Sequence, residues 1–330
     1  MEPAIVSKPE QRSTFLQMSW GFRYLARMSV LVVVVMGALH VAWSAIASTA
    51  VRFYYQKRIF DIHRLTGADE ERKWMAAYIE SQVSDDQVLA AGSSFTFLYP
   101  FDVAYTYTAE LNRRGVKTAN ISATGYGVKA IHDAILCPLI QQNKRPRAII
   151  LEISLVNEVA QIRDGRIKAS VGDCPDVGSD GLFLFALKHP LGVDWLSIAR
   201  DQFYEIVPPE KPSLGVVPDS YFPTAADFAK ARPLLESNIK RLYARAQSIS
   251  DNVVMFVTPV YYDGVTVVGR DAGMVRAQFE TTLELCKQTA GPNCVDTSGL
   301  IAERNFANMT HFNASGAKAL ADLIDPKIVR

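Results

Sequence analysis

The stretch LAAGSSFTFLYP, residues 89–100, decides how the rest of the chain can be interpreted. Its apolar first half is typical of a buried strand, which Gly92 ends just before two hydroxyl side chains, Ser93 and Ser94. A serine that follows a parallel strand can act as a nucleophile. It can also simply cap the next helix, because its side-chain oxygen accepts a backbone N–H bond. The surrounding sequence has to distinguish these two roles.

Strands and helices are predicted to alternate beyond this stretch. Apolar runs predict five strands, at residues 87–91, 116–122, 147–154, 252–260 and 293–298. Helical periodicity predicts helices at 101–115, 128–142, 233–248 and 274–288, and a last helix that Asn313 caps. Such alternation predicts an α/β fold, a three-layer, doubly wound parallel sheet with helices on both faces. The order of elements is flavodoxin-like.

One segment near the N-terminus departs from the ordinary globular composition. Residues 28–51 contain no Asp, Glu, Lys or Arg, and about 20 apolar residues suffice to cross a bilayer as a helix. A signal peptide is the alternative, since Ala45 and Ala47 have cleavage-like spacing. The apolar run exceeds the ~7–15 residues of such a signal, however. We therefore predict an uncleaved, single-pass anchor in the inner (cytoplasmic) membrane, with the main domain in the periplasm.

These features divide the chain into four parts. Residues 1–27 are predicted to form a cytoplasmic tail, 28–51 the transmembrane helix, 52–85 a helical connector and 86–330 the main domain. Within the main domain, residues 160–223 hold no clear strand and are predicted to be a surface insertion. Insertions of this length commonly serve as lids or partner surfaces.

Composition narrows the classes of partner. The chain has 35 basic and 34 acidic residues, so it offers no basic field for nucleic acid, and we predict no nucleic-acid partner. An even number of cysteines fits an oxidising compartment such as the periplasm. Cys286 and Cys294 would close a small loop and leave Cys137 to pair with Cys174, although four free buried thiols are the alternative. No CxxC motif and no metal-like histidine spacing occur, and we predict no metal site.

Polar residues follow the predicted strands at the edge where open parallel sheets bind ligands. They are Ser93 and Ser94, Ser122, Asn157 and Glu158, and the segment 308–316. Acyl chemistry needs a nucleophile, a base within hydrogen-bond reach, and donors for the developing oxyanion. Ser94 and His311 suit the first two roles. The backbone N–H groups of Ser94 and Ser122, with the Asn157 amide, suit the third.

At these positions the chain resembles the SGNH (GDSL-type) hydrolases, which are named for a Ser, Gly, Asn and His spread over four sequence blocks. Gly92-Ser93-Ser94 stands at the usual Gly-Asp-Ser block and is similar to the variant in membrane-anchored acyl-transfer relatives. NISATG, residues 120–125, places Ser122 at the usual oxyanion glycine. Asn157 is the candidate for the third block, about two residues late relative to its strand.

In the fourth block, Asn308 takes the place of the usual Asp three residues before the histidine, His311. Asn308 is therefore the predicted partner of His311, with Asp296 as the alternative partner. An Asn oxygen can orient an imidazole but brings no charge to stabilise its protonated form. The following FNASGAKAL, residues 312–320, is similar to the region after the family's histidine.

The resemblance implies a membrane-anchored protein that transfers or removes ester-linked acyl groups, acetyl foremost, on an extracellular or cell-wall polysaccharide. It implies no cofactor. Similar relatives take part in alginate acetylation and D-alanyl transfer to teichoic acids, which implies a membrane-bound O-acyltransferase as partner. A plain esterase is one alternative. An alternative of another class is a catalytically silent glycan-binding or scaffold protein of an envelope polysaccharide assembly.

A partial dinucleotide motif offers a competing interpretation. GYGVKA, residues 125–130, has the spacing GxGxxA between a predicted strand and helix, with Glu152 somewhat over 20 residues further on. We do not favour it, because it follows the second predicted strand and lies in a domain predicted to be outside the cytoplasm.

Overall fold

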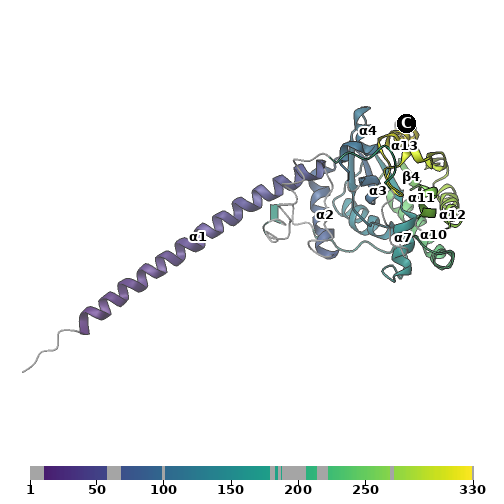
Figure 1. The fold of residues 1–330 in the computed structure, drawn as a ribbon. Helices are drawn as coiled ribbons and strands as arrows, with labels where there is room; N and C mark the ends of the chain where they lie inside the picture. Colours follow the sequence, from purple (N-terminus) through teal and green to yellow (C-terminus); the bar gives the residue numbers. More distant parts are fainter. Residues whose placement is uncertain are drawn as a thin grey trace, which may run out of the picture.

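A five-stranded parallel sheet forms the centre of the domain (Figure 1). The computed structural model describes residues 11–57, 68–98, 101–178, 183–184, 187, 206–213, 222–267 and 271–328. The strands are β1 (Val88–Gly92), β2 (Thr118–Ser122), β3 (Ala148–Ile153), β4 (Val253–Val257) and β5 (Cys294–Val295). Their order is β2-β1-β3-β4-β5, the flavodoxin-like order of a doubly wound sheet. This confirms the predicted α/β fold.

All five predicted strands are present, and the last two are much shorter than predicted, since β4 ends at Val257 and β5 at Val295. β5 ends at Val295 because the next residue begins a turn, in which the Asp296 carboxylate accepts the Ser298 N–H at 3.0 Å. The other four strands are almost completely buried except for the start of β2, which lies at the edge of the sheet.

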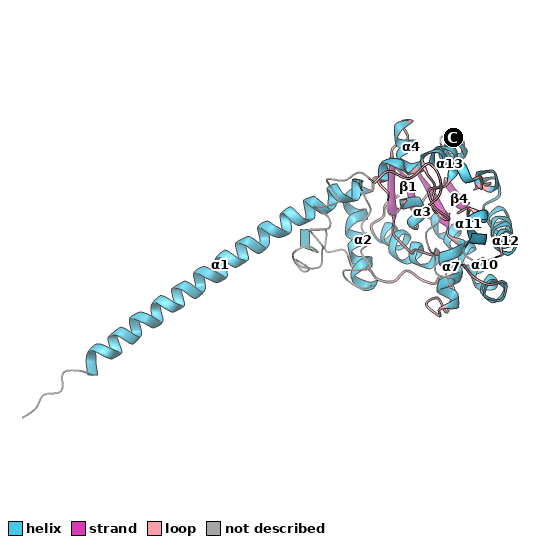
Figure 2. Ribbon diagram, in the orientation of Figure 1, coloured by secondary structure: helices cyan, strands magenta, loops and turns pink. Residues whose placement is uncertain are grey.

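Alternating side chains of the strands supply two separate cores. Leu89, Leu151 and Met255 point into one core, whereas Ala90 and Ile150 point into the other. The first core is covered by α2 (Ala68–Gln82), α5 (Val128–Ile131), α6 (Cys137–Gln141), α7 (Leu155–Arg163), α10 (Ala225–Gln247) and α12 (Ala272–Ala290). The second is covered by α4 (Tyr107–Arg113) and α13 (Ala314–Ile328) (Figure 2). Helices on both faces make three layers.

Shorter elements connect these layers. A π-helical turn, His132–Leu136, joins α5 to α6, while α3 (Ser94–Phe97) follows β1 and α11 (Tyr262–Val267) follows β4. Single 3₁₀ turns lie at Val103–Tyr105, Gly291–Asn293, Ser298–Leu300 and Glu303–Asn305.

Two predicted helices differ in their starting points. α10 begins well before the predicted residue 233, because Thr224 and Asp227 form a reciprocal capping box, and Pro233 lies inside the helix. The helix predicted at 101–115 is a 3₁₀ turn followed by α4, which starts only after Thr106 caps it by accepting the Ala109 N–H. α12 and the Asn313-capped α13 lie where predicted.

The long helix α1 (Gln11–Lys57) extends away from the domain (Figure 1). It includes much of the segment predicted as a cytoplasmic tail, and its apolar part runs over Phe22–Ile46 with a mean hydropathy of 2.1. By length and composition this part suits either a membrane anchor or a signal sequence. α2, which we placed in the connector, packs into the first core through buried Trp74 and Ile79.

Two disulfides close loops of different length. Cys137 is bonded to Cys174, and Cys286 to Cys294, as the oxidising-compartment interpretation suggested. The first ties α6 to the start of the predicted insertion, where Gln141 also donates to the Pro175 carbonyl at 2.7 Å.

Removing the two disulfides is expected to cost different amounts of stability. The first disulfide links Cys137 and Cys174, which are 37 positions apart in the sequence. The second links Cys286 and Cys294, which are 8 positions apart. Loop-closure entropy predicts losses of about 4 kcal/mol for C137S/C174S and about 2.5 kcal/mol for C286S/C294S. Urea unfolding of the two double variants measures this difference. An equal or reversed loss would show that native-state contacts, not loop length, set the effect.

Candidate active site

Ser94 lies directly after β1, at the point where the strand order of the sheet reverses. β1 is bonded to β2 on one side and to β3 on the other, and doubly wound sheets bind ligands at this switch point. Ser93 has an extended backbone, and its Oγ accepts the Phe95 N–H at 3.4 Å. Capping of α3 therefore falls to Ser93. Ser94 is partly exposed, and no described residue bonds to its hydroxyl, which is available to a ligand.

A buried carboxylate supports this turn from the neighbouring strand. Glu152 in β3 is fully buried, and its Oε2 accepts the N–H groups of Ser93 and Thr96, each at 2.9 Å. Its Oε1 is hydrogen-bonded to the Ser93 hydroxyl. Burial raises the pKa of Glu152, and these hydrogen bonds oppose the rise. The Glu152 carboxyl group thus holds the turn from the neighbouring strand.

Gly92 is required where β1 passes Glu152. A Cβ atom at this position would lie 2.4 Å from the Glu152 Oε2 and 2.4 Å from the Thr96 Oγ1. Both contacts are far inside van der Waals distance, so a side chain here would displace the carboxylate that holds the turn. The glycine of the GSS motif therefore has a steric role.

One backbone N–H group of this turn has no acceptor among the described residues. The N–H groups of Ser93, Phe95 and Thr96 all have acceptors. Among the described residues, the N–H of Ser94 has none. It is therefore available to an oxyanion that forms next to the Ser94 hydroxyl.

Ser122 lies at the carboxyl end of the edge strand β2, in register with Gly92. The main-chain groups of Lys117 and Ala123 bond to β1. Because alternate residues of a parallel strand face the same neighbour, the N–H of Ser122 points instead to the free edge of β2. The sheet does not use this predicted oxyanion donor. The Ser122 hydroxyl itself donates to Asn120.

Asn157 occupies the first turn of α7. Its side-chain amide donates to the Tyr126 carbonyl at 3.3 Å, and its backbone N–H donates to the Ser154 Oγ at 3.4 Å. One amide hydrogen therefore holds the loop that follows β2. The structure shows no acceptor among the described residues for the second hydrogen.

Asn308 orients His311 through a single oxygen atom. Its Oδ1 accepts the backbone N–H groups of Thr310 and His311, at 2.9 and 2.8 Å, and lies 3.0 Å from the His311 Nδ1. An amide oxygen only accepts, so the Nδ1 carries the proton and the Nε2 keeps its lone pair. The Nε2 is buried and has no hydrogen-bond partner in the described part of the chain. This is the tautomer that a general base needs.

Burial also lowers the pKa of His311, to about 4. The imidazole is therefore neutral at physiological pH and ready to accept a proton. A carboxylate in place of Asn308 would favour the protonated ring, whereas the amide offers no charge to offset burial.

Two phenylalanines join the Ser94 turn to the His311 loop. Phe95 follows Ser94 and Phe312 follows His311, and their buried rings meet edge to face with centroids 4.8 Å apart. Residues distant in the sequence are thereby held at the same end of the sheet.

The His311 loop is fixed on two further sides. The Tyr261 N–H, after β4, donates to the Met309 carbonyl at 2.9 Å. The Ser213 N–H donates to the Ala307 carbonyl at 2.8 Å, which brings part of the predicted insertion to this loop.

Asp296, the alternative partner for His311, has other partners. Its Oδ2 accepts from the Lys287 ammonium at 2.8 Å, and its Oδ1 accepts the Ser298 N–H. The bond from Lys287, first among these, lowers the pKa of Asp296 to about 2. The structure therefore places Asn308, and not Asp296, on the imidazole.

In the competing dinucleotide interpretation, a pyrophosphate would bind at the start of α5. A carboxylate of the protein already occupies this place. The Glu158 Oε2 accepts the Val128 N–H at 2.7 Å at the start of α5, and a Cβ atom on Gly127 would lie 2.4 Å from the same oxygen. Glu158 is fully buried and also accepts from Asn238 at 2.8 Å. This helix start is closed by the protein's own side chain.

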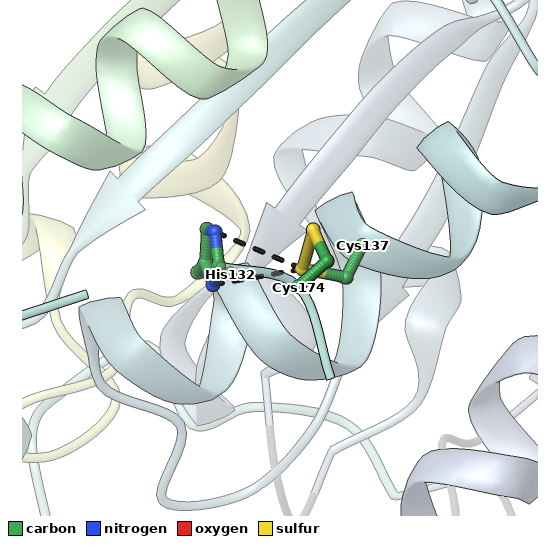
Figure 3. Close-up of side chains that lie close together, drawn as sticks. All are labelled: His132, Cys137 and Cys174. Atoms are coloured by element: carbon green, nitrogen blue, oxygen red, sulfur yellow. Dashed lines mark hydrogen bonds between the residues drawn. A yellow bond between two sulfur atoms is a disulfide. The ribbon is translucent and has the colours of Figure 1, made fainter. Parts of the chain in front are cut away.

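His132 lies beside the Cys137–Cys174 disulfide, which closes the longer of the two loops (Figure 3). Both ring nitrogens lie within 3.7 Å of the Cys137 sulfur, and Cys174 completes a group with the spacing of metal ligands. The two sulfurs are bonded to each other, so neither is a thiolate that could bind a metal.

Glu152 is the residue of the site that sequence reasoning missed. It was considered only as part of the dinucleotide motif. The signal was a carboxylate inside the otherwise apolar run AIILEI, residues 148–153, because a charge in a fully buried strand needs a partner. Its partners, Ser93 and Thr96, lie in the turn and helix that follow the neighbouring strand β1, and could not be located from spacing.

Solved structures with a similar arrangement include proteins described as hydrolases, lipases and acylhydrolases. No family model matches the chain, and no curated protein matches it. The structure is similar to LAE5, an alpha/beta hydrolase enzyme from the metagenome of Lake Arreo, at 15% identity and a TM-score of 0.40, over 75% of this chain and 96% of that one. It is also similar to a lipase/acylhydrolase from Enterococcus faecalis, at 14% identity and a TM-score of 0.39. The match covers 73% of this chain and 95% of that one.

A third similar structure is a protein from Desulfitobacterium hafniense assigned to the lipolytic G-D-S-L family, at 12% identity and a TM-score of 0.40. The match covers 73% of this chain and 98% of that one. These likenesses concern the arrangement of sheet and helices. What the site does has to be argued from its own residues.

Proposed function

We propose that this chain is a membrane-anchored, SGNH-like protein in which Ser94 and His311 transfer or remove ester-linked acyl groups, acetyl foremost, on an extracellular polysaccharide. The observation that supports it most is the state of His311. Its Nδ1 is held by Asn308, while its buried Nε2 has no partner among the described residues. Phe95 and Phe312 hold the Ser94 turn and the His311 loop at the same end of the sheet, and the Nε2 is not hydrogen-bonded to Ser94 in this structure. Nucleophile activation requires these two groups to come within hydrogen-bond reach when substrate binds.

The reaction follows from these groups. The Ser94 Oγ attacks the acyl carbonyl carbon while the His311 Nε2 takes its proton. The oxyanion is held by the N–H group of Ser94 and by the second amide hydrogen of Asn157. The Ser122 N–H points to the free edge of β2, away from β1, and takes no part. Collapse transfers the acyl group to Ser94, and the leaving oxygen takes the proton from His311. A hydroxyl of the polymer, or water, then attacks the acyl carbon while the His311 Nε2 takes its proton. The bond between the acyl carbon and the Ser94 Oγ breaks, and His311 returns the proton to the Ser94 Oγ.

A cavity of about 550 Å³ lies at the loop after β2 and suits a hydroxyl-rich acceptor, although neither Ser94 nor His311 lines it. Thr124, Tyr126, Lys129 and Gln161 contribute to its walls. Such polar groups can hydrogen-bond a sugar, and the Tyr126 carbonyl is the group that Asn157 bonds. The acyl donor is supplied by a membrane-bound O-acyltransferase in this proposal, which the apolar α1 helix would keep close.

The pH dependence of covalent labelling tests the proposal. An alkyl fluorophosphonate is expected to label Ser94, at a rate that is constant above about pH 5 and falls near pH 4, where His311 becomes protonated. In Asn308→Asp the new negative charge should raise the pKa of His311 by about 1–3 units and move this fall upward. Mass spectrometry of the labelled peptide gives site and rate.

His311→Ala is the control, and it should label very slowly at every pH. Rapid labelling of His311→Ala, or labelling of another serine, would remove the proposed pair. No labelling of the folded wild type at any pH would favour the silent glycan-binding or scaffold protein.

A further inference from the structure

A hydrogen bond joins the predicted insertion to the apolar part of α1. The Nε2 of His40 lies 2.8 Å from the carbonyl oxygen of Leu187. His40 falls within Phe22–Ile46, six residues before the end of that segment, which is about 9 Å along a helix. In Figure 1 a short teal piece of the chain lies beside this part of α1. The contact is therefore at bilayer depth if α1 crosses a membrane.

The burial of Ser44 marks the same contact. Ser44 is fully buried, whereas its neighbours Trp43 and Ile46 are 41% and 63% exposed. Its hydroxyl donates to the His40 carbonyl at 2.8 Å. One polar stripe of α1 is therefore covered, while the rest of the apolar helix is open.

The segment that meets His40 is itself apolar. It reads GLFLFAL over residues 181–187, between Asp180 and Lys188. The side chains of Phe183 and Leu184 are 42% and 45% exposed. Seven residues are too few to cross a bilayer, which takes about 20, but they are enough to enter one leaflet.

We propose that Phe183, Leu184 and Leu187 form a second membrane contact, which enters the leaflet on the domain side and docks on α1. This rests on the proposed anchoring. A backbone carbonyl in lipid needs a donor, and His40 supplies one to Leu187. Phe183 and Leu184 then face acyl chains and not water. The same bond gives a role to His40, the one ionisable residue within residues 28–51.

The same insertion contacts both the proposed membrane region and the loop of His311. Two described residues of the insertion, Ile206 and Ser213, contact the domain. The Ile206 carbonyl accepts the N–H of Asp102, which precedes the 3₁₀ turn Val103–Tyr105, at 3.1 Å. A few residues later, the Ser213 N–H bonds to Ala307, which precedes Asn308. An acyl donor that arrives along the membrane surface would meet this side of the site.

Fluorescence quenching by lipids tests the second contact. The four native cysteines are paired, so a single new cysteine can be labelled with an NBD fluorophore in the full-length protein. Phe183→Cys and Leu184→Cys are compared with Val33→Cys in the apolar helix. Leu323→Cys is the matched control, an exposed leucine on α13. Each protein is reconstituted in phosphatidylcholine vesicles with ordinary or brominated acyl chains.

Brominated lipid is expected to quench Phe183→Cys and Leu184→Cys by about half or more of its effect on Val33→Cys, and to leave Leu323→Cys unchanged. Quenching of Val33→Cys with none at positions 183 and 184 would overturn the second contact and leave the anchor in place. Absence of quenching at Val33→Cys as well would overturn the anchor, and with it this inference.

Discussion

Ser94→Ala is expected to lower turnover of a chromogenic acetyl ester on the order of 10³-fold or more, because the oxyanion donors alone supply little of a nucleophilic mechanism. The protein should remain folded, since the Ser94 hydroxyl makes no bond to any described residue. Initial rates with the purified full-length chain, together with its unfolding midpoint in urea, measure both effects.

Ser93→Ala is the matched control for this change. It removes the N-cap of α3 and the bond to Glu152, which should cost about 1–2 kcal/mol of stability. The nucleophile is kept, so turnover should fall far less than in Ser94→Ala. Equal turnover in Ser94→Ala and the wild type would show that the ester is cleaved elsewhere. A larger loss in Ser93→Ala would exchange the roles of the two serines.

Glu152→Ala is expected to destabilise the domain by about 3–5 kcal/mol, because it leaves two buried N–H groups without an acceptor and opens a cavity under the active site. Glu152→Gln should cost much less. An amide oxygen can accept from Ser93 and Thr96, and the amide nitrogen can donate to the Ser93 hydroxyl. Urea unfolding of the two variants separates loss of the hydrogen bonds from loss of the charge.

The pH dependence of stability provides the second measurement on Glu152. Its pKa in the folded protein is raised above the ordinary value of 4.5, so the folded state retains a proton that the unfolded state has lost. Stability should therefore decrease as the pH rises from about 4.5 toward the raised pKa, and this decrease should be absent in Glu152→Gln. A wild type whose stability rises over the same range, relative to Glu152→Gln, would show that the carboxylate is ionised in the folded protein.

Local sequence was enough to predict the sheet, because each strand is a short apolar run followed by a turn or a cap. It also brought forward Ser94 and His311, since each lies at such a boundary. The contacts between Glu152 and Ser93, and between His40 and Leu187, could not be predicted. Each depends on two segments far apart in the sequence, and nothing in the spacing of one identifies its partner. The predicted length of β5 was wrong, because the turn at Asp296 ends the strand at Val295.

The uncharged pairing of Asn308 with His311 has a consequence for where the reaction can take place. Protons accumulate at anionic surfaces, and a potential of about −50 mV lowers the local pH by almost one unit. A histidine with an ordinary pKa would be partly protonated in such a layer and would lose part of its function. A base whose pKa lies near 4 stays neutral there. In the proposed function, His311 would therefore stay neutral even against an acidic polymer or an anionic membrane, where the bulk pH is a poor guide to the proton concentration that the imidazole meets.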